Sequence, residues 1–268
     1  MTGHLFLVCA ADAEGRSFLR EQSFCAPMHI SKPFTESGAL VVNVVNPTAG
    51  FLQGDSVTCE VRVESGARLV LTSPSASRIH HSGDGCARLE QNFTVEENAF
   101  LEVNPELFIP QRGARYEQTT AISVESGGEL IFFETLAPGR VAMGEAFEFA
   151  RLDWKTDVRW DGTLAVRERY ALSPDDESLA ALRCAFPQSY YASCFAFGES
   201  FLNAEICWRE IATLHSDRVW IGCSPATAGG CVVKIVATDS PTLRRVLAEV
   251  RRNLYAALGR AAPEWRRV

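Results

Sequence analysis

The sequence predicts a mainly β protein, in which a layered, solenoid-like β-structure is followed by a smaller α+β region at the C-terminal side. Two observations predict this fold class. A unit of about thirty residues occurs four times, and apolar and polar residues alternate inside each unit. Units repeated at this spacing bury their apolar faces against one another, because none can bury its own alone.

Each copy of the repeat opens on Val and carries Leu at its seventh position, and successive copies begin 32, 29 and 34 residues apart. A turn pair lies between Val and Leu, with Gly, Asn or Asp at the fourth position to supply the positive φ of a tight connection. The copies are Val63-Glu-Ser-Gly-Ala-Arg-Leu-Val-Leu-Thr72, Val95-Glu-Glu-Asn-Ala-Phe-Leu-Glu-Val-Asn104, Val124-Glu-Ser-Gly-Gly-Glu-Leu-Ile-Phe-Phe133 and Val158-Arg-Trp-Asp-Gly-Thr-Leu-Ala-Val-Arg167.

The residues on both sides of each turn alternate with a period of two. Before the first turn the apolar positions are Val57, Cys59 and Val61, and after it they are Leu69 and Leu71. Alternation with β-branched and aromatic residues is typical of strands, whereas a helical repeat would show apolar spacings of three and four. Each copy therefore predicts two strands joined at a corner, and we expect the copies to stack in register.

Stacking in register would place two acids at one corner, because Glu134 and Glu168 each follow directly after a copy. Neighbouring strands lie about 4.7–4.9 Å apart, so two carboxylates there would repel each other unless a cation or an arginine sits with them. Arg140 and Arg167 are close in sequence. The pair is therefore interpreted either as structural acids held by arginine or as a cation-handling or catalytic pair.

The chain divides near residue 172 into a repeat-built β region, 1–172, and an α+β region, 173–268, packed on it as one unit. An apolar segment at 5–10 predicts an opening strand, and residues 173–177 form a polar loop that can start a helix. The C-terminal region is expected to contain about two helices. Its predicted elements are a strand at 189–197, a helix at 199–213, strands at 219–222 and 232–236, and a final helix.

The final helix has the clearest pattern in the sequence. Ser240 can cap it and Pro241 suits its first turn. One stripe is apolar, formed by Leu243, Val246, Leu247, Val250, Leu254 and Leu258. The opposite face carries four arginines, interpreted as a solvated face or as a partner-docking surface: Arg244, Arg245, Arg251 and Arg252.

Composition excludes several classes of function. The net charge of −7 disfavours a nucleic-acid partner, which requires a basic face. The nine cysteines are odd in number and no two are separated by two residues, which argues against zinc ribbons and a disulfide scaffold. No apolar run reaches the length of a membrane span, and residues 5–10 are too short for a secretory signal. We expect a reduced, cytoplasmic protein without a membrane contact.

Catalytic motifs are scarce. His80 and His81 are adjacent, so in a strand they would point to opposite faces and chelate poorly; a surface or structural role competes with a weak metal role. Asp55 follows Gly54 in a tight turn, where it either caps its own backbone or lines a polar pocket. Hydrolase and nucleotide motifs such as Gly-x-Ser-x-Gly are missing, and the protein is predicted not to be an enzyme.

Several turn motifs together resemble the urease accessory protein family UreD, also called UreH. The resemblance runs from about residue 36 to 258 with its motifs in the right order. The motifs are Asn46-Pro-x-x-Gly50-x-x-x-Gly54-Asp55, Gly66-Ala-Arg-Leu-x-Leu-Thr72, Leu101-Glu102-x-x-Pro105, Ala137-Pro138-Gly139-Arg140 with Gly144-Glu145, and Arg167-Glu168-Arg169.

The resemblance implies a non-enzymatic maturation factor with a mostly β fold. Such proteins bind the accessory protein UreF, which recruits the GTPase UreG, and the assembly docks on apo-urease to deliver nickel. A polar internal tunnel is thought to pass the metal, so no cofactor is expected beyond Ni²⁺ in transit. By motif matching, Asp55, Glu134 and Glu168 fall at candidate positions along this path. Carboxylate oxygens suit a conduit from which the ion must leave again.

Two other classes of function compete with this expectation. The first is a carbohydrate-active β-solenoid enzyme that uses Glu134 and Glu168, since glycosidases work with pairs of carboxyl groups. The tryptophans are scattered, however, and form no aromatic row for sugar binding. The second is an assembly module that handles no metal.

Overall fold

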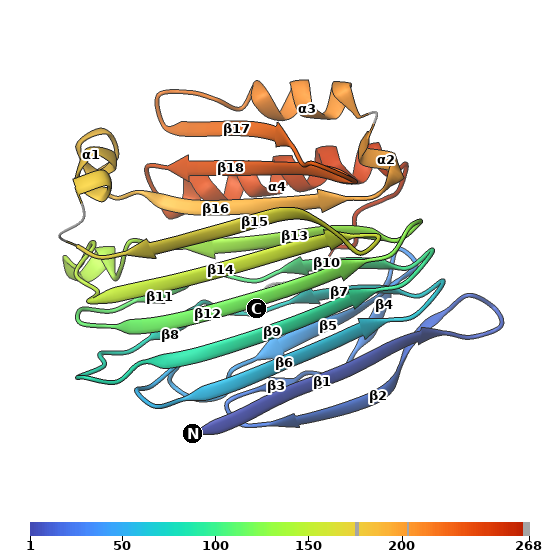
Figure 1. Cartoon of the computed structure of the whole chain (residues 1–268), viewed down its shortest axis with the longest axis horizontal. Helices are drawn as coiled ribbons and strands as arrows, with labels where there is room; N and C mark the ends of the chain where they lie inside the picture. The colour runs from blue at the N-terminus through green and yellow to red at the C-terminus, as the bar shows by residue number, and fades with distance from the viewer. Residues whose placement is uncertain (175–176, 203, 265–268) are drawn as a thin grey trace.

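Two β-sheets face each other and enclose the core in the computed structural model, which describes residues 1–174, 177–202 and 204–264. In Figure 1 the chain climbs from the blue N-terminal strands to the orange C-terminal elements, with the seven-stranded sheet in front. In spatial order this sheet contains β15 (Thr163–Leu172), β14 (Arg151–Trp160), β12 (Arg115–Val124), β9 (Ala87–Val95), β6 (Ser56–Val63), β1 (Thr2–Ala11) and β2 (Ser17–Cys25).

The second sheet has eleven strands. Its main path is β17 (Val219–Pro225), β18 (Gly230–Ala237), β16 (Tyr190–Phe197), β13 (Glu129–Leu136), β10 (Phe100–Asn104), β7 (Arg68–Thr72), β5 (Ala39–Val45) and β3 (His29–Ile30). Three short strands attach to it: β4 (Phe34–Glu36), β8 (Ser77–Ile79) and β11 (Phe108–Pro110). A mainly β, solenoid-like fold is therefore confirmed.

The first three copies of the repeat form the coils of the solenoid. Each crosses at its turn from the seven-stranded sheet into the eleven-stranded sheet, so that β6, β9 and β12 pair in parallel on one side and β7, β10 and β13 on the other. Leu69, Leu101 and Leu130 stand opposite one another in register and are fully buried. The predicted stacking is confirmed for these copies, and Leu40 of β5 extends the same row.

The fourth copy departs from the prediction. β14 and β15 form an antiparallel hairpin within one sheet, and Val158 stands opposite Ile122, two residues short of the predicted register. The cause lies in the turn, because Asp161 and Gly162 both have positive φ, of 46° and 75°. Two successive residues of this kind make a tight hairpin that returns the chain beside the strand it left. The fourth copy therefore does not cross to the other sheet.

The eleven-stranded sheet continues past the predicted division at residue 172. β16 pairs antiparallel with β13, β18 pairs with β16, and β17 pairs with β18. The three predicted C-terminal strands are thus present. Asp175 and Asp176 of the predicted polar loop lie outside the described residues.

Four α-helices are present in the described ranges, where about two were expected. They are α1 (Glu177–Ala185), α2 (Glu199–Leu202), α3 (Glu205–Ala212) and α4 (Ser240–Ala257), and a 3₁₀ turn spans Val141–Met143. The single helix predicted for 199–213 is wrong, since α2 ends at Leu202 and α3 begins at Glu205. None of the helices in the described part combines the length and apolar character needed to cross a bilayer. All nine cysteines are free thiols.

Helix α4 covers the face of the eleven-stranded sheet that points away from the other sheet; Figure 1 shows it behind β18. Its apolar stripe, including Leu243, Val250 and Leu254, is buried against residues such as Phe100 and Ile131. The N-cap is Asp239, one residue before the predicted Ser240, because the Asp239 carboxylate accepts a hydrogen bond of 2.8 Å from the Thr242 backbone amide.

Asp239→Ala is expected to lower the free energy of unfolding by about 1 kcal/mol, because the variant leaves the Thr242 backbone N–H without its side-chain acceptor. Urea denaturation followed by circular dichroism measures this effect. Asp217→Ala, in the exposed turn before β17, is the matched control and should change stability little. An equal loss in both variants would contradict the assignment of the cap.

Candidate functional site

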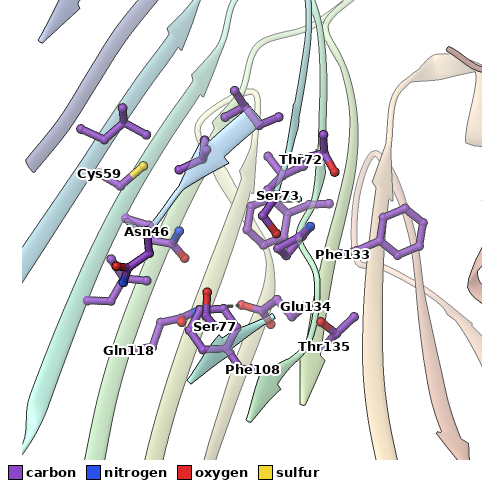
Figure 2. A pocket seen from close by; sticks show the side chains of 18 of the residues that line it. Asn46, Cys59, Thr72, Ser73, Ser77, Phe108, Gln118, Phe133, Glu134 and Thr135 are labelled. Carbon is purple, nitrogen blue, oxygen red and sulfur yellow. Dashed lines mark hydrogen bonds between the residues drawn. The ribbon is translucent and has the colours of Figure 1, made fainter. Parts of the chain in front are cut away.

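Polar side chains interrupt the apolar space between the two sheets around Glu134, whose exposed fraction is 4%. The carboxylate lies on the wall of a cavity of about 100 Å³. Figure 2 shows Glu134 and Gln118 reaching toward each other from facing strands. Elsewhere the cavity is lined mostly by apolar side chains, among them Leu71, Phe93 and Phe132. Glu134 is therefore an acid inside the core.

Among the described residues, hydrogen bonds rather than a directly contacting cation hold the Glu134 carboxylate. Its Oε1 accepts from Trp154 Nε1 at 2.8 Å, from Thr156 Oγ1 at 2.9 Å and from Gln118 Nε2 at 3.3 Å. Ser193 Oγ lies 3.5 Å from Oε2. Burial raises the pKa of Glu134 to about 7, although the bonds from Trp154 and Thr156 oppose that rise. Near neutral pH this group is therefore poised between its protonated and its ionised form.

A second carboxylate, Glu168, projects from β15 toward the same interior. It forms an ion pair with the ammonium group of Lys234 and accepts a hydrogen bond of 2.9 Å from the Tyr191 hydroxyl. The arginines proposed from the sequence are engaged elsewhere, since Arg140 pairs with Glu145 and Arg167 pairs with Asp157. The cation beside Glu168 is therefore a lysine from a distant part of the chain.

Glu134 and Glu168 do not stack on neighbouring strands, as the repeat predicted, because β13 and β15 belong to different sheets. The two acids approach from facing sheets. Thr156, which donates to Glu134, stands opposite Glu168 in the β14–β15 hairpin. On the other sheet Glu134, Ser193 and Lys234 stand opposite one another across three strands. The structure thus brings the two acids into one polar region by another route.

Aromatic rings separate this region into two cavities. Trp154 lines the cavity that holds Glu134, while Tyr170 and Tyr191 line a second cavity of about 310 Å³ that contains Glu168 and reaches α1. The ring of Tyr170 stacks on Trp154 with centroids 5.9 Å apart and meets Tyr191 edge-on at 5.9 Å. The acids therefore mark consecutive compartments with an aromatic partition between them.

Asp55 lies outside this region, in the turn before β6. Its carboxylate accepts the Leu52 backbone N–H at 2.8 Å and pairs with the Met1 ammonium group at 2.8 Å. It is not among the described residues that line the cavity of Glu134. Of the two roles left open by the sequence, the structure favours the capping of its own turn.

His80 and His81 follow β8 and bond to backbone carbonyls on different segments. The Nε2 atom of His80 lies 2.9 Å from the oxygen of Ala49, and Nδ1 of His81 lies 3.2 Å from the oxygen of Arg112. Within residues 1–174, 177–202 and 204–264, no three His, Cys, Asp or Glu side chains converge as a metal-binding group. A structural role fits both histidines.

The four arginines of α4 do not share one face. Arg251 turns toward the sheet, where its guanidinium binds Glu102 through two hydrogen bonds, and Arg244 pairs with Glu106 at 3.0 Å. Arg252 is exposed and pairs with Glu249 on the same helix. Arg245 is exposed as well. The interpretation as a solvated face is therefore wrong for Arg251, whose side chain is 14% exposed, while the partner-docking surface stays a prediction.

Sequence reasoning missed the residues that complete the site, above all Lys234. One signal was present, because Lys234 is the sole charged residue in the strand Gly230-Cys-Val-Val-Lys-Ile-Val-Ala237. Gln118 carried a similar signal as a polar residue at an inward position of β12. Tyr191 and Trp154 carried none, since aromatic residues are ordinary in a core.

Comparisons with known proteins agree on one family. The sequence model of the UreD urease accessory proteins matches residues 1–268. A urease accessory protein UreD of Opitutus terrae is 41% identical over 271 residues, covering 99% of this chain and 98% of the relative. The UreD protein of Acetivibrio thermocellus is 29% identical over 91% of this chain and 94% of its own. A urease accessory protein UreH of Helicobacter hepaticus is 25% identical over 85% and 89%.

Proposed function

The chain belongs to the UreD family of urease accessory proteins, and from this premise we propose that it is a scaffold of urease maturation that passes Ni²⁺ toward the urease active site. It binds apo-urease and a UreF-type partner, which recruits a UreG-type GTPase, and it catalyses no reaction of its own. The family match over the whole chain is the observation that carries the proposal.

The polar region between the sheets supports a path for the ion. Glu134 and Glu168 supply carboxylate oxygens in two cavities on either side of the Trp154–Tyr170 stack, and Gln118, Thr156 and Ser193 donate hydrogen bonds to Glu134. Sparse hard ligands of this kind hold a divalent ion weakly, which a path requires. The proposed path leaves out Asp55, whose carboxylate bonds to the Leu52 backbone amide and the Met1 ammonium group.

A glycosidase is less compatible with the structure. A glycosidase needs two carboxyl groups that flank the sugar bond to be cleaved. In this protein Glu134 is only 4% exposed and lies on a cavity of about 100 Å³. Pockets for small molecules usually measure about 300–1,000 Å³, so the cavity of Glu134 is too small, and the larger cavity of about 310 Å³ is lined by Glu168 without Glu134. An assembly module without metal remains the alternative that the variants below separate from the nickel path.

Deletion of the gene in cells that express the cognate urease operon is expected to leave urease without nickel and without activity, and restoration should recover both. Urease activity and the nickel content of purified urease measure this outcome. Full urease activity in the deletion strain would overturn the maturation role itself.

Glu134→Ala and Glu168→Ala are expected to lower nickel delivery while the variant still co-purifies with its UreF-type partner and apo-urease. Glu90→Ala, on the exposed face of β9, is the matched control. If both variants assemble and deliver nickel as well as the unchanged protein, the scaffold operates without this path. If they fail to assemble, the carboxylates serve structure.

A further inference from the structure

Lys234 occupies an unusual place for a lysine, on a strand whose other residues are apolar or glycine and on the face that carries Glu134. Its Nζ lies 5.2 Å from the centroid of the Phe195 ring and 5.7 Å from that of Tyr191. The ammonium group donates to Glu168 and, at 3.1 Å, to the Tyr191 hydroxyl. A cation is thus already bound inside the polar region.

The charges of this region define what a further cation would meet. With both carboxylates ionised, Glu134, Glu168 and Lys234 sum to −1, and Arg169, which lines the cavity of Glu168, is paired with Asp157. A divalent ion added beside the lysine would therefore bring the sum to +1. The ammonium group also occupies an oxygen of Glu168. Two cations at this carboxylate would repel each other strongly at reduced dielectric. Glu168 can therefore hold either the lysine or a divalent ion.

We propose that Lys234 is a displaceable counter-cation, whose ammonium group holds Glu168 until a divalent metal ion takes its place and then returns to release that ion. This inference rests on the proposed nickel path and adds a residue that controls it. The side chain of Lys234 is 40% exposed, whereas that of Glu168 is 14% exposed. The lysine head can therefore move into water on its flexible stem while the carboxylate stays in place.

Competition between Lys234 and a divalent ion for Glu168 suits a site through which the ion passes better than a site that stores it. An ion that replaces Lys234 gains the carboxylate only after the ion pair has been broken, so its net affinity is lowered by the free energy of that pair. The same pair drives the reverse step when the lysine returns. Without the lysine charge, Glu168 would bind a divalent ion more tightly and release it more slowly.

Lys234→Met tests the inference, because it keeps the length and apolar stem of the side chain and removes its charge. Isothermal titration of the purified full-length protein with NiCl₂ is expected to show a Kd on the order of tenfold lower than that of the unchanged protein. Lys234→Arg should not tighten binding. Lys155→Met, on the exposed face of β14, controls for the loss of one positive charge.

The double variant Lys234→Met/Glu168→Gln is expected to lose the gain, since the carboxylate that binds the ion is absent. Lys234→Gln provides the same comparison with a polar side chain if the methionine variant does not fold. The inference is overturned if neither uncharged variant binds Ni²⁺ more tightly, or if the gain persists without Glu168. The gene-deletion experiment does not depend on this titration. Failure of the inference about Lys234 can therefore be distinguished from failure of the proposed function.

Discussion

Arg251→Met is expected to lower the free energy of unfolding by about 3–5 kcal/mol, one of the largest losses that a single substitution can cause in this fold. Glu102 is fully buried, and Arg251 donates to its two oxygens at 2.5 and 2.8 Å. Tyr255 and Asn104 complete the hydrogen bonds of the carboxylate, at 2.6 and 3.2 Å. Removal of the guanidinium leaves an uncompensated charge beneath α4.

Chemical denaturation with guanidinium chloride measures the loss, and two variants show its origin. Arg252→Met changes the adjacent arginine, which is 73% exposed, and should cost less than about 0.5 kcal/mol. The double variant Glu102→Gln/Arg251→Met should recover part of the stability, because a neutral amide is buried at lower cost than a carboxylate. Equal small effects for Arg251→Met and Arg252→Met would contradict the buried ion pair.

The sequence was sufficient to predict the solenoid because the repeat is local. Val and Leu recur at fixed positions, and the residues between them alternate, so the three parallel coils follow from spacing alone. The fourth copy has the same spacing and a different outcome. Two residues determine that the chain returns within the same sheet, since Asp161 and Gly162 both adopt positive φ and close a hairpin.

The candidate site was only partly predictable. The repeat points to Glu134 and Glu168 by their position after its copies, yet the predicted stacking on neighbouring strands is wrong, because the two acids approach from facing sheets. Lys234 and Tyr191 enter the site through the C-terminal strands, and no local pattern relates residue 234 to residue 168. The burial of Arg251 is likewise not predictable from its own helix, since its partner Glu102 lies 149 residues away.

Glu134→Gln is expected to make the protein more stable than the unchanged chain at pH 8, by up to about 3 kcal/mol. Burial raises the pKa of Glu134 from 4.5 to about 7. Between these values the folded protein retains a proton that the unfolded chain has released, so its stability falls as the pH rises through this window. Above pH 7 the full cost of the buried charge is present.

The substitution removes this cost with little change in packing. The amide oxygen of glutamine can accept the three bonds that Oε1 now accepts from Trp154, Thr156 and Gln118. Its NH₂ group can donate to Ser193 Oγ. The difference in unfolding free energy between the two proteins should therefore be small at pH 4.5, grow between pH 4.5 and 7, and remain constant above pH 7.

Urea denaturation at pH 4.5, 6, 7 and 8 measures the difference, and Glu90→Gln on the exposed face of β9 should show none. A constant difference across the series would mean that Glu134 does not titrate in this window. A gain confined to high pH would show that the fold keeps an acid that lowers its own stability at neutral pH. Such a residue is retained for what it does and not for packing. Glu134→Gln can then be tested for nickel delivery to urease in the same way as Glu134→Ala. If it delivers less nickel, the Glu134 carboxylate both lowers the stability of the unchanged protein at neutral pH and supports its function.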